Sequence, residues 1–114
     1  EDYPKAPRES YFKIAEAMEY SSIMAISLED AHRYNDLKLL EIFKNTTIIF
    51  GVVAIAKSRV ESVDEIRNRL TEAIEHIDAN RLVAAPDCGL GILGKELAIR
   101  KLTNLSEAAH SIKT

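Results

Sequence analysis

This chain contains three short apolar segments, which are separated by amphipathic segments. The apolar segments span residues 23–28, 47–56 and 82–85, and each has the length of a β-strand. The segment 47–56 is almost entirely apolar and rich in β-branched residues, without the alternation of a half-exposed strand. This pattern predicts a strand buried on both faces, as in a parallel sheet. Apolar residues recur with helical spacing in the remaining segments, which predicts helices over 11–20, 36–44, 62–77 and 95–110.

Individual residues predict where two of these helices begin. Ser10 is the expected N-cap of the first helix, and Ser62 with Glu65 three residues later forms a capping-box pattern for the third. Met18 and Met24 stand at apolar positions and are expected in the core.

The predicted order, α-β-α-β-α-β-α, is that of repeated βα units. A strand begins every 25 to 35 residues and is followed by a helix, so the three strands should lie side by side and parallel. Two architectures satisfy this order: an open doubly wound sheet and part of a (βα)₈ barrel. The first strand lacks the glycine-rich turn of a dinucleotide-binding fold, and Gly89, Gly91 and Gly94 follow the third strand instead. We therefore favour an α/β fold that is a portion, about three βα units, of a barrel that needs about 250 residues.

Composition narrows the class of function. The chain has 114 residues, enough for one small domain, with 46% apolar and 29% charged residues and a net charge of −3. Basic residues are scattered among acidic ones, so nucleic acid is not an expected partner. No apolar run approaches the roughly 18 residues of a membrane span. The single cysteine cannot form an internal disulfide, which is typical of a reducing compartment and predicts a cytoplasmic protein.

Residues with chemical potential follow the predicted strands. Because parallel strands end at one edge of their sheet, these side chains should gather there: Glu29, Asp30, His32, Lys57, Asp87 and Cys88. Cys88 lies on a turn bounded by Pro86 and Gly89, a place that suits a thiolate ligand or nucleophile as well as a structural role. Glu29 and Asp30 are alternatively helix caps or solvated side chains, and His32 a loop histidine bonded to backbone. Lys57 and Arg59 either pair with nearby acids or bind an anionic substrate group.

Several segments resemble one enzyme family. Residues 81–90, with the motif Pro-Asp-Cys-Gly-Leu, look like the last-strand signature of the C-terminal (βα)₈ domain of cobalamin-independent methionine synthases. Its superfamily includes epoxyalkane–coenzyme M transferase and is similar in fold to uroporphyrinogen decarboxylase. Residues 25–29 resemble the family's strand that ends in a zinc-ligating glutamate. The segments 51–53, 58–62 and 65–70 resemble the unit that follows.

The resemblance implies a zinc site and a set of roles. Cys88 and Glu29 would be zinc ligands, while Lys57, Arg59 and Asp87 would bind substrate. The family's other ligands lie in an H-x-C motif on an earlier strand, and this sequence contains none, so residues 1–114 are expected to be a C-terminal fragment of a longer enzyme. Where the family has Asp and His in a D-I-H pattern, this chain has Ala54 and Ala56, which cannot donate a proton to a folate.

Three hypotheses follow. The first is zinc-dependent methyl or alkyl transfer to a homocysteine-type thiol, with a small-molecule thiol, an alkyl donor and the remaining barrel units as partners. The second is a metal-free lyase or decarboxylase-like enzyme on the same fold, in which Cys88 is structural. The third is an inactive half-barrel or assembly module, whose two open sheet edges favour a homo-oligomer. In each case the fragment alone is expected to be inactive.

Overall fold

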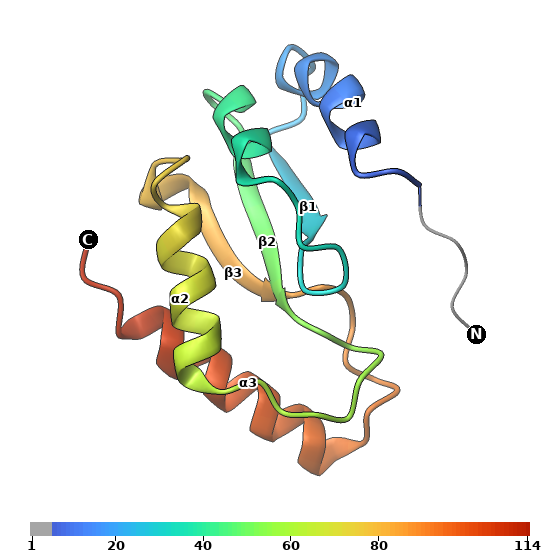
Figure 1. Cartoon of the computed structure of the whole chain (residues 1–114), viewed down its shortest axis with the longest axis vertical. Helices are drawn as coiled ribbons and strands as arrows, with labels where there is room; N and C mark the ends of the chain where they lie inside the picture. The colour runs from blue at the N-terminus through green and yellow to red at the C-terminus, as the bar shows by residue number, and fades with distance from the viewer. Residues whose placement is uncertain (1–5) are drawn as a thin grey trace.

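Three parallel strands form a single sheet in the order β1-β2-β3. The computed structural model describes residues 6–114, and its strands are β1 (Ala25–Glu29), β2 (Thr47–Val53) and β3 (Leu82–Pro86). Figure 1 shows them side by side, with β2 in the centre. The prediction of adjacent parallel strands is confirmed.

The strand register brings the carboxyl ends of all three strands to one edge. Glu29 lies opposite Gly51, and Gly51 lies opposite Ala85. Beyond that point the pairing is irregular, because Val53 rather than the intervening residue lies opposite Pro86. The loops that leave the three strands therefore meet at this edge, where enzymes built from βα units place their active sites.

The helices correspond to the predicted ones in order, with corrections at their ends. They are α1 (Glu9–Glu19), α2 (Val63–Ala73) and α3 (Lys95–His110), together with two 3₁₀ helices, η1 (Leu37–Ile42) and η2 (Ala79–Arg81). The last helix matches its prediction, whereas α2 ends four residues early and the helix expected over 36–44 is the six-residue η1. Leu37, Leu39 and Leu40 are its buried residues, and the spacing of Leu37 and Leu40 is the three-residue period of a 3₁₀ helix.

Of the two predicted helix N-caps, the one at α2 is confirmed and the one at α1 is wrong. At α2 the Glu65 N–H donates to Ser62 Oγ at 3.1 Å and the Ser62 N–H donates to a Glu65 oxygen at 2.8 Å, so the capping box is present. At α1 the helix begins at Glu9, and the N-cap Arg8 makes no side-chain capping bond. Ser10 therefore lies within the first turn rather than before it.

The core lies between the helices and one face of the sheet. Ile48, Phe50 and Val52 of β2 and Ile66 and Leu70 of α2 are buried there. The opposite face has little cover among the described residues, with Ala25 and Ser27 exposed and Val83 46% exposed. In a closed barrel this second face would line the interior. Met24, expected in the core, is 85% exposed at the start of β1, so that prediction is wrong, whereas Met18 packs against the core.

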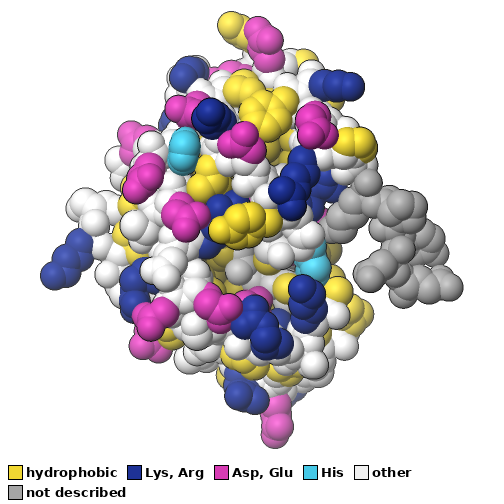
Figure 2. All heavy atoms as spheres, viewed as in Figure 1, with side chains coloured by type: hydrophobic (Ala, Val, Ile, Leu, Met, Phe, Trp, Pro, Cys, Tyr) yellow, Lys and Arg dark blue, Asp and Glu magenta, His cyan; other side chains and the backbone are white. Residues whose placement is uncertain are grey.

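The surface carries charges of both signs. Lysine and arginine side chains are interspersed with aspartate and glutamate over the face drawn in Figure 2. Within residues 6–114, no helix combines the length and hydropathy needed to cross a membrane.

Glu19, the last residue of α1, connects that helix to the start of β2. Its carboxylate accepts hydrogen bonds from the Thr46 hydroxyl at 2.7 Å and from the Asn45 N–H at 2.8 Å. These bonds, led by that of the Thr46 hydroxyl, lower the pKa of Glu19 from 4.5 to about 2. A carboxyl group whose pKa is lower in the folded than in the unfolded protein stabilises the fold at pH values above the unfolded-state pKa. This stabilisation is lost as the pH falls toward the folded-state pKa.

We predict that Glu19→Gln flattens the pH dependence of the unfolding free energy between pH 4.5 and pH 2. Urea denaturation at a series of pH values measures this slope, with the exposed Glu16→Gln on the same helix as the control. Equal slopes for Glu19→Gln and the unsubstituted protein would contradict the assignment.

Candidate functional site

Asp30, the first residue after β1, is held by an arginine from α2. Its side chain is 1% exposed and accepts hydrogen bonds from Arg69 Nε at 2.6 Å and Nη2 at 2.9 Å. Burial alone would lower the pKa of Arg69, but the hydrogen bonds to Asp30 outweigh it and raise that pKa. The guanidinium also stacks on Tyr34 at 3.8 Å from the ring centroid, and Tyr34 has a positive φ of 51°. This clamp fixes the β1 loop against α2.

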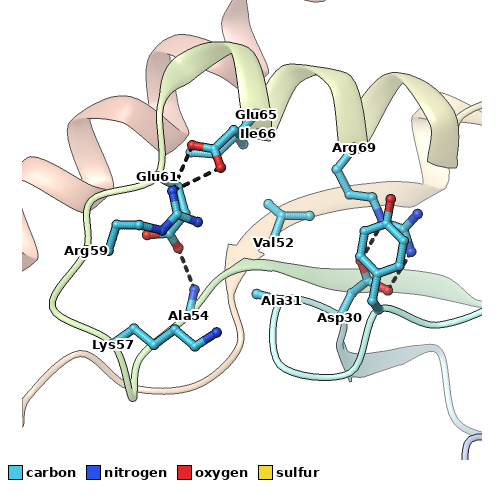
Figure 3. A pocket seen from close by; sticks show the side chains of 11 residues that line it. Asp30, Ala31, Val52, Ala54, Lys57, Arg59, Glu61, Glu65, Ile66 and Arg69 are labelled. Carbon is cyan, nitrogen blue, oxygen red and sulfur yellow. Dashed lines mark hydrogen bonds and ion pairs between the residues drawn. The ribbon is translucent and has the colours of Figure 1, made fainter.

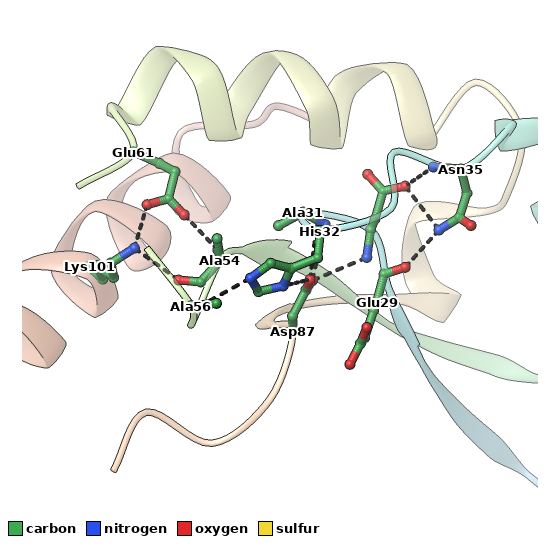
Figure 4. Close-up of polar contacts among 10 residues, drawn as sticks. Glu29, Ala31, His32, Asn35, Ala54, Ala56, Glu61, Asp87 and Lys101 are labelled. Atoms are coloured by element: carbon green, nitrogen blue, oxygen red, sulfur yellow. Dashed lines mark hydrogen bonds and ion pairs between the residues drawn. The ribbon is translucent and has the colours of Figure 1, made fainter. Parts of the chain in front are cut away.

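Asp87, the first residue after β3, reaches across to the same loop. Its side chain is fully buried, and its oxygens accept hydrogen bonds from the N–H groups of Asp30, Ala31 and His32 at 3.1, 3.0 and 2.9 Å. His32 Nδ1 lies 2.6 Å from Asp87 Oδ2 (Figure 4). Within the protein, these N–H groups and the His32 ring are the partners of the carboxylate, and the substrate contact predicted for Asp87 stays a prediction.

A buried ion pair between Lys101 of α3 and Glu61 holds the end of β2. Lys101 of α3 has no exposed side-chain surface and donates to Glu61 Oε1 at 2.8 Å and to the Ala54 carbonyl at 2.9 Å. The Ala54 N–H donates to Glu61 Oε2 at 2.7 Å. Both backbone polar groups of Ala54 are therefore bonded to this pair, which turns the chain away from the sheet after Val53 (Figure 4).

Glu29 and Cys88 lie at the same edge as these contacts. Glu29 precedes Asp30 and Cys88 follows Asp87, so a hydrogen bond of 3.1 Å between those two neighbours connects them. In Figure 4 the Glu29 side chain points away from Asn35 and from α2, toward the uncovered side of the sheet. Cys88 is exposed. Within residues 6–114, no three His, Cys, Asp or Glu side chains are close enough together to hold a metal ion.

Lys57 and Arg59 line a different feature, a pocket of about 140 Å³ between the β1 loop, the end of β2 and the start of α2 (Figure 3). Arg59 donates to both carboxylate oxygens of Glu65 at 2.9 and 3.0 Å, and these bonds raise its pKa. The lysine extends along the rim of the pocket. The structure thus divides the five predicted site residues into two groups, with Glu29, Asp87 and Cys88 at the strand ends and the two cations beside them in the pocket.

Sequence reasoning missed the buried contacts that shape this edge, although two of them had a signal. Lys101 stands between Leu97 and Leu105 at four-residue spacing, so a charge on an apolar stripe required a buried partner. Gly51 interrupts an apolar strand, which is typical of a close approach by another part of the chain. The pairing of Asp30 with Arg69 had no such signal, because the two residues are far apart in sequence and unremarkable in composition.

Comparison with known proteins shows that this chain is similar to one family of enzymes. Residues 9–111 match the family model described as cobalamin-independent synthase, catalytic domain. The methionine synthase of Thermococcus kodakarensis is 30% identical over 105 residues, which cover 91% of this chain and 31% of that protein. The methionine synthase of Methanothermobacter thermautotrophicus is 35% identical over 86 residues, covering 74% and 28%. The chain therefore spans about a third of the length of the curated relatives it matches.

A solved structure gives the same relation in three dimensions. The B12-independent methionine synthase from Shewanella sp. W3-18-1, in complex with selenomethionine, superposes with a TM-score of 0.83 at 27% identity. The match covers 88% of this chain and 29% of that one. The three parallel strands thus correspond to a portion of a TIM barrel, as predicted from the repeated βα units.

We predict that Lys101→Met destabilises the protein by about 3–5 kcal/mol, because it leaves the buried Glu61 carboxylate without its partner. Chemical denaturation measures the loss, and the exposed Lys95→Met at the start of α3 is the matched control. Adding Glu61→Gln to Lys101→Met should recover part of the stability, because the unpaired charge is then absent. A loss below about 0.5 kcal/mol, the range of surface substitutions, would contradict the assignment.

Proposed function

Because the chain belongs to the catalytic-domain family of cobalamin-independent synthases, we propose that it supplies part of a zinc-dependent site for methyl or alkyl transfer to a homocysteine-type thiol. The observation that carries the proposal is the common position of Glu29 and Cys88. Both lie at the carboxyl edge of the parallel sheet, joined through the Asp30–Asp87 hydrogen bond. This is the edge where barrel enzymes assemble their active sites.

The two side chains have the donor chemistry that zinc requires. Thiolate sulfur and carboxylate oxygen are both common zinc ligands, and zinc in proteins is usually bound by four ligands. Glu29 and Cys88 would supply two of them, and the resemblance assigns the others to an H-x-C motif that this chain does not contain. Residues 1–114 would then be the C-terminal portion of the whole enzyme, inactive alone.

Zinc bound at this edge would lower the pKa of the acceptor thiol, so that the thiolate is available as nucleophile at neutral pH. Cys88 would hold the metal, and Glu29 would hold it too or move aside when the thiolate binds. Lys57 and Arg59 line a neighbouring pocket and would bind an anionic part of a substrate. The compact ammonium of Lys57 would contact it directly, whereas Arg59 would share its guanidinium between that group and Glu65.

The alkyl donor is constrained by two alanines. Ala54 and Ala56 stand where the family has an Asp and a His, and neither methyl side chain can transfer a proton. A donor whose leaving group needs a proton from these positions is disfavoured. We therefore propose an activated methyl or alkyl group other than methyltetrahydrofolate as the donor.

The rest of the barrel is the proposed macromolecular partner. Among the described residues, β1 and β3 each have one unpaired edge, and the second face of the sheet is largely uncovered. Additional βα units would pair with these edges and cover that face. A second copy of the chain is the alternative occupant. With one exposed, unpaired cysteine, we propose the cytoplasm as the location.

Metal analysis of the whole protein that carries this chain tests the proposal. We predict stoichiometric zinc, lost in Cys88→Ala and in Glu29→Gln, with affinity lowered by more than about 100-fold, since even the outer partners of metal ligands are worth 10–100-fold. The exposed Glu75→Gln is the matched control and should keep its zinc. Stoichiometric zinc that survives Cys88→Ala unchanged would refute the ligand assignment. Lyase or decarboxylase activity in a protein without zinc would favour the metal-free enzyme.

A further inference from the structure

Three consecutive backbone N–H groups converge on one carboxylate at the carboxyl edge of the sheet. They belong to Asp30, Ala31 and His32, and their donor–acceptor distances to the Asp87 oxygens are 3.1, 3.0 and 2.9 Å. The Asp30 and Ala31 N–H groups are shared with the Gly51 carbonyl oxygen, at 3.0 and 2.9 Å. Successive N–H groups that point to one spot form a concave binding site for an anion. Here the anion is a side chain of the protein itself, and that side chain has no exposed surface.

Gly51 makes this arrangement sterically feasible. A Cβ atom at that position would lie 2.3 Å from Asp87 Oδ1 and 2.7 Å from the Asp87 Cα. The Asp87 N–H donates to the Val53 carbonyl at 2.9 Å, where the pairing of β2 and β3 becomes irregular. The aspartate therefore crosses over the end of β2 directly above a glycine and reaches the loop that follows β1.

His32 connects the Asp87 carboxylate to the loop that follows β2. An ionised carboxylate only accepts hydrogen bonds, so His32 Nδ1 donates to Asp87 Oδ2 at 2.6 Å. The Ala56 N–H donates to the other ring nitrogen, Nε2, at 3.2 Å. The imidazole is therefore neutral and links the loop after β2 to the Asp87 carboxylate, so that one buried side chain connects all three strand ends.

We infer that Asp87 is a positioning residue, which sets the separation and orientation of Glu29 and Cys88 as metal ligands. The inference rests on the proposed zinc-dependent function. Glu29 is covalently adjacent to the first donor of the N–H group, and Cys88 is covalently adjacent to the acceptor. Any movement of Asp87 out of its site changes the position of one ligand relative to the other.

Asp87→Asn in the whole, zinc-loaded protein tests the inference. The amide keeps the shape of the side chain but turns two of its hydrogens toward backbone donors. We expect zinc affinity, measured by competition with a chromophoric chelator, to fall by about 10–100-fold, the range for groups that orient metal ligands. In the cobalt-substituted protein, the thiolate-to-cobalt charge-transfer absorption should shift or weaken, whereas the far-ultraviolet circular dichroism stays unchanged.

A pair of glycine variants provides the matched control. Gly51→Ala retains every ligand and the Asp87 carboxylate, but its Cβ displaces that carboxylate, so zinc affinity should fall as in Asp87→Asn. Gly89→Ala adds the same methyl group beside Cys88, where nothing lies within 4 Å, and zinc affinity should be unchanged.

The outcomes separate this inference from the function on which it rests. Unchanged zinc affinity and an unchanged cobalt spectrum in Asp87→Asn would overturn the inference and leave the zinc-dependent function intact. Absence of zinc from the unsubstituted protein would overturn both. If Asp87→Asn does not fold, His32→Ala decides the question, because it removes one partner of the carboxylate and retains the backbone donors, and unchanged zinc affinity there would overturn the inference.

Discussion

The burial of the Asp87 carboxylate is the constraint on which the rest of this sheet edge depends. A buried charge is costly unless hydrogen bonds satisfy it, and here three backbone N–H groups and an imidazole do so. These partners come from the loop after β1, and the imidazole in turn accepts from the loop after β2. This one side chain thereby couples the three loops, in addition to the backbone hydrogen bonds that the Asp30, Ala31 and Asp87 N–H groups make there.

The same principle recurs at the other two strand ends. Arg69 from α2 neutralises Asp30, and Lys101 from α3 neutralises Glu61. Each buried acid also accepts a backbone N–H near a strand end, from Asn35 to Asp30 and from Ala54 to Glu61. Replacing one partner of such a pair costs more than replacing an exposed ion pair, because the remaining charge stays buried. Buried polar contacts therefore hold the backbone directly after Glu29 and directly before Cys88.

The sequence predicted what apolar periodicity and local capping determine. The three strands, their parallel order, the capping box at Ser62 and the helix over 95–110 depend on neighbouring residues, and these match the structure. The end of β2 was misplaced because Ala54–Ala56 continue the apolar run. Instead of continuing the sheet, the backbone N–H and carbonyl of Ala54 bond to the side chains of Glu61 and Lys101, which the apolar pattern of the strand does not reveal. The partners of Asp87 were missed for the same reason, since they lie more than fifty residues away.

X-ray absorption at the zinc edge of the whole protein tests whether Cys88 and Glu29 bind the metal. Zinc–sulfur and zinc–oxygen distances differ, at about 2.3 Å and about 2.0–2.2 Å, so the numbers of sulfur and lighter ligands can be counted separately. We predict that Cys88→Ser lowers the sulfur count by one and that Glu29→Gln leaves it unchanged while altering the shell of lighter ligands. A sulfur count that is the same in Cys88→Ser and the unsubstituted protein would contradict this prediction.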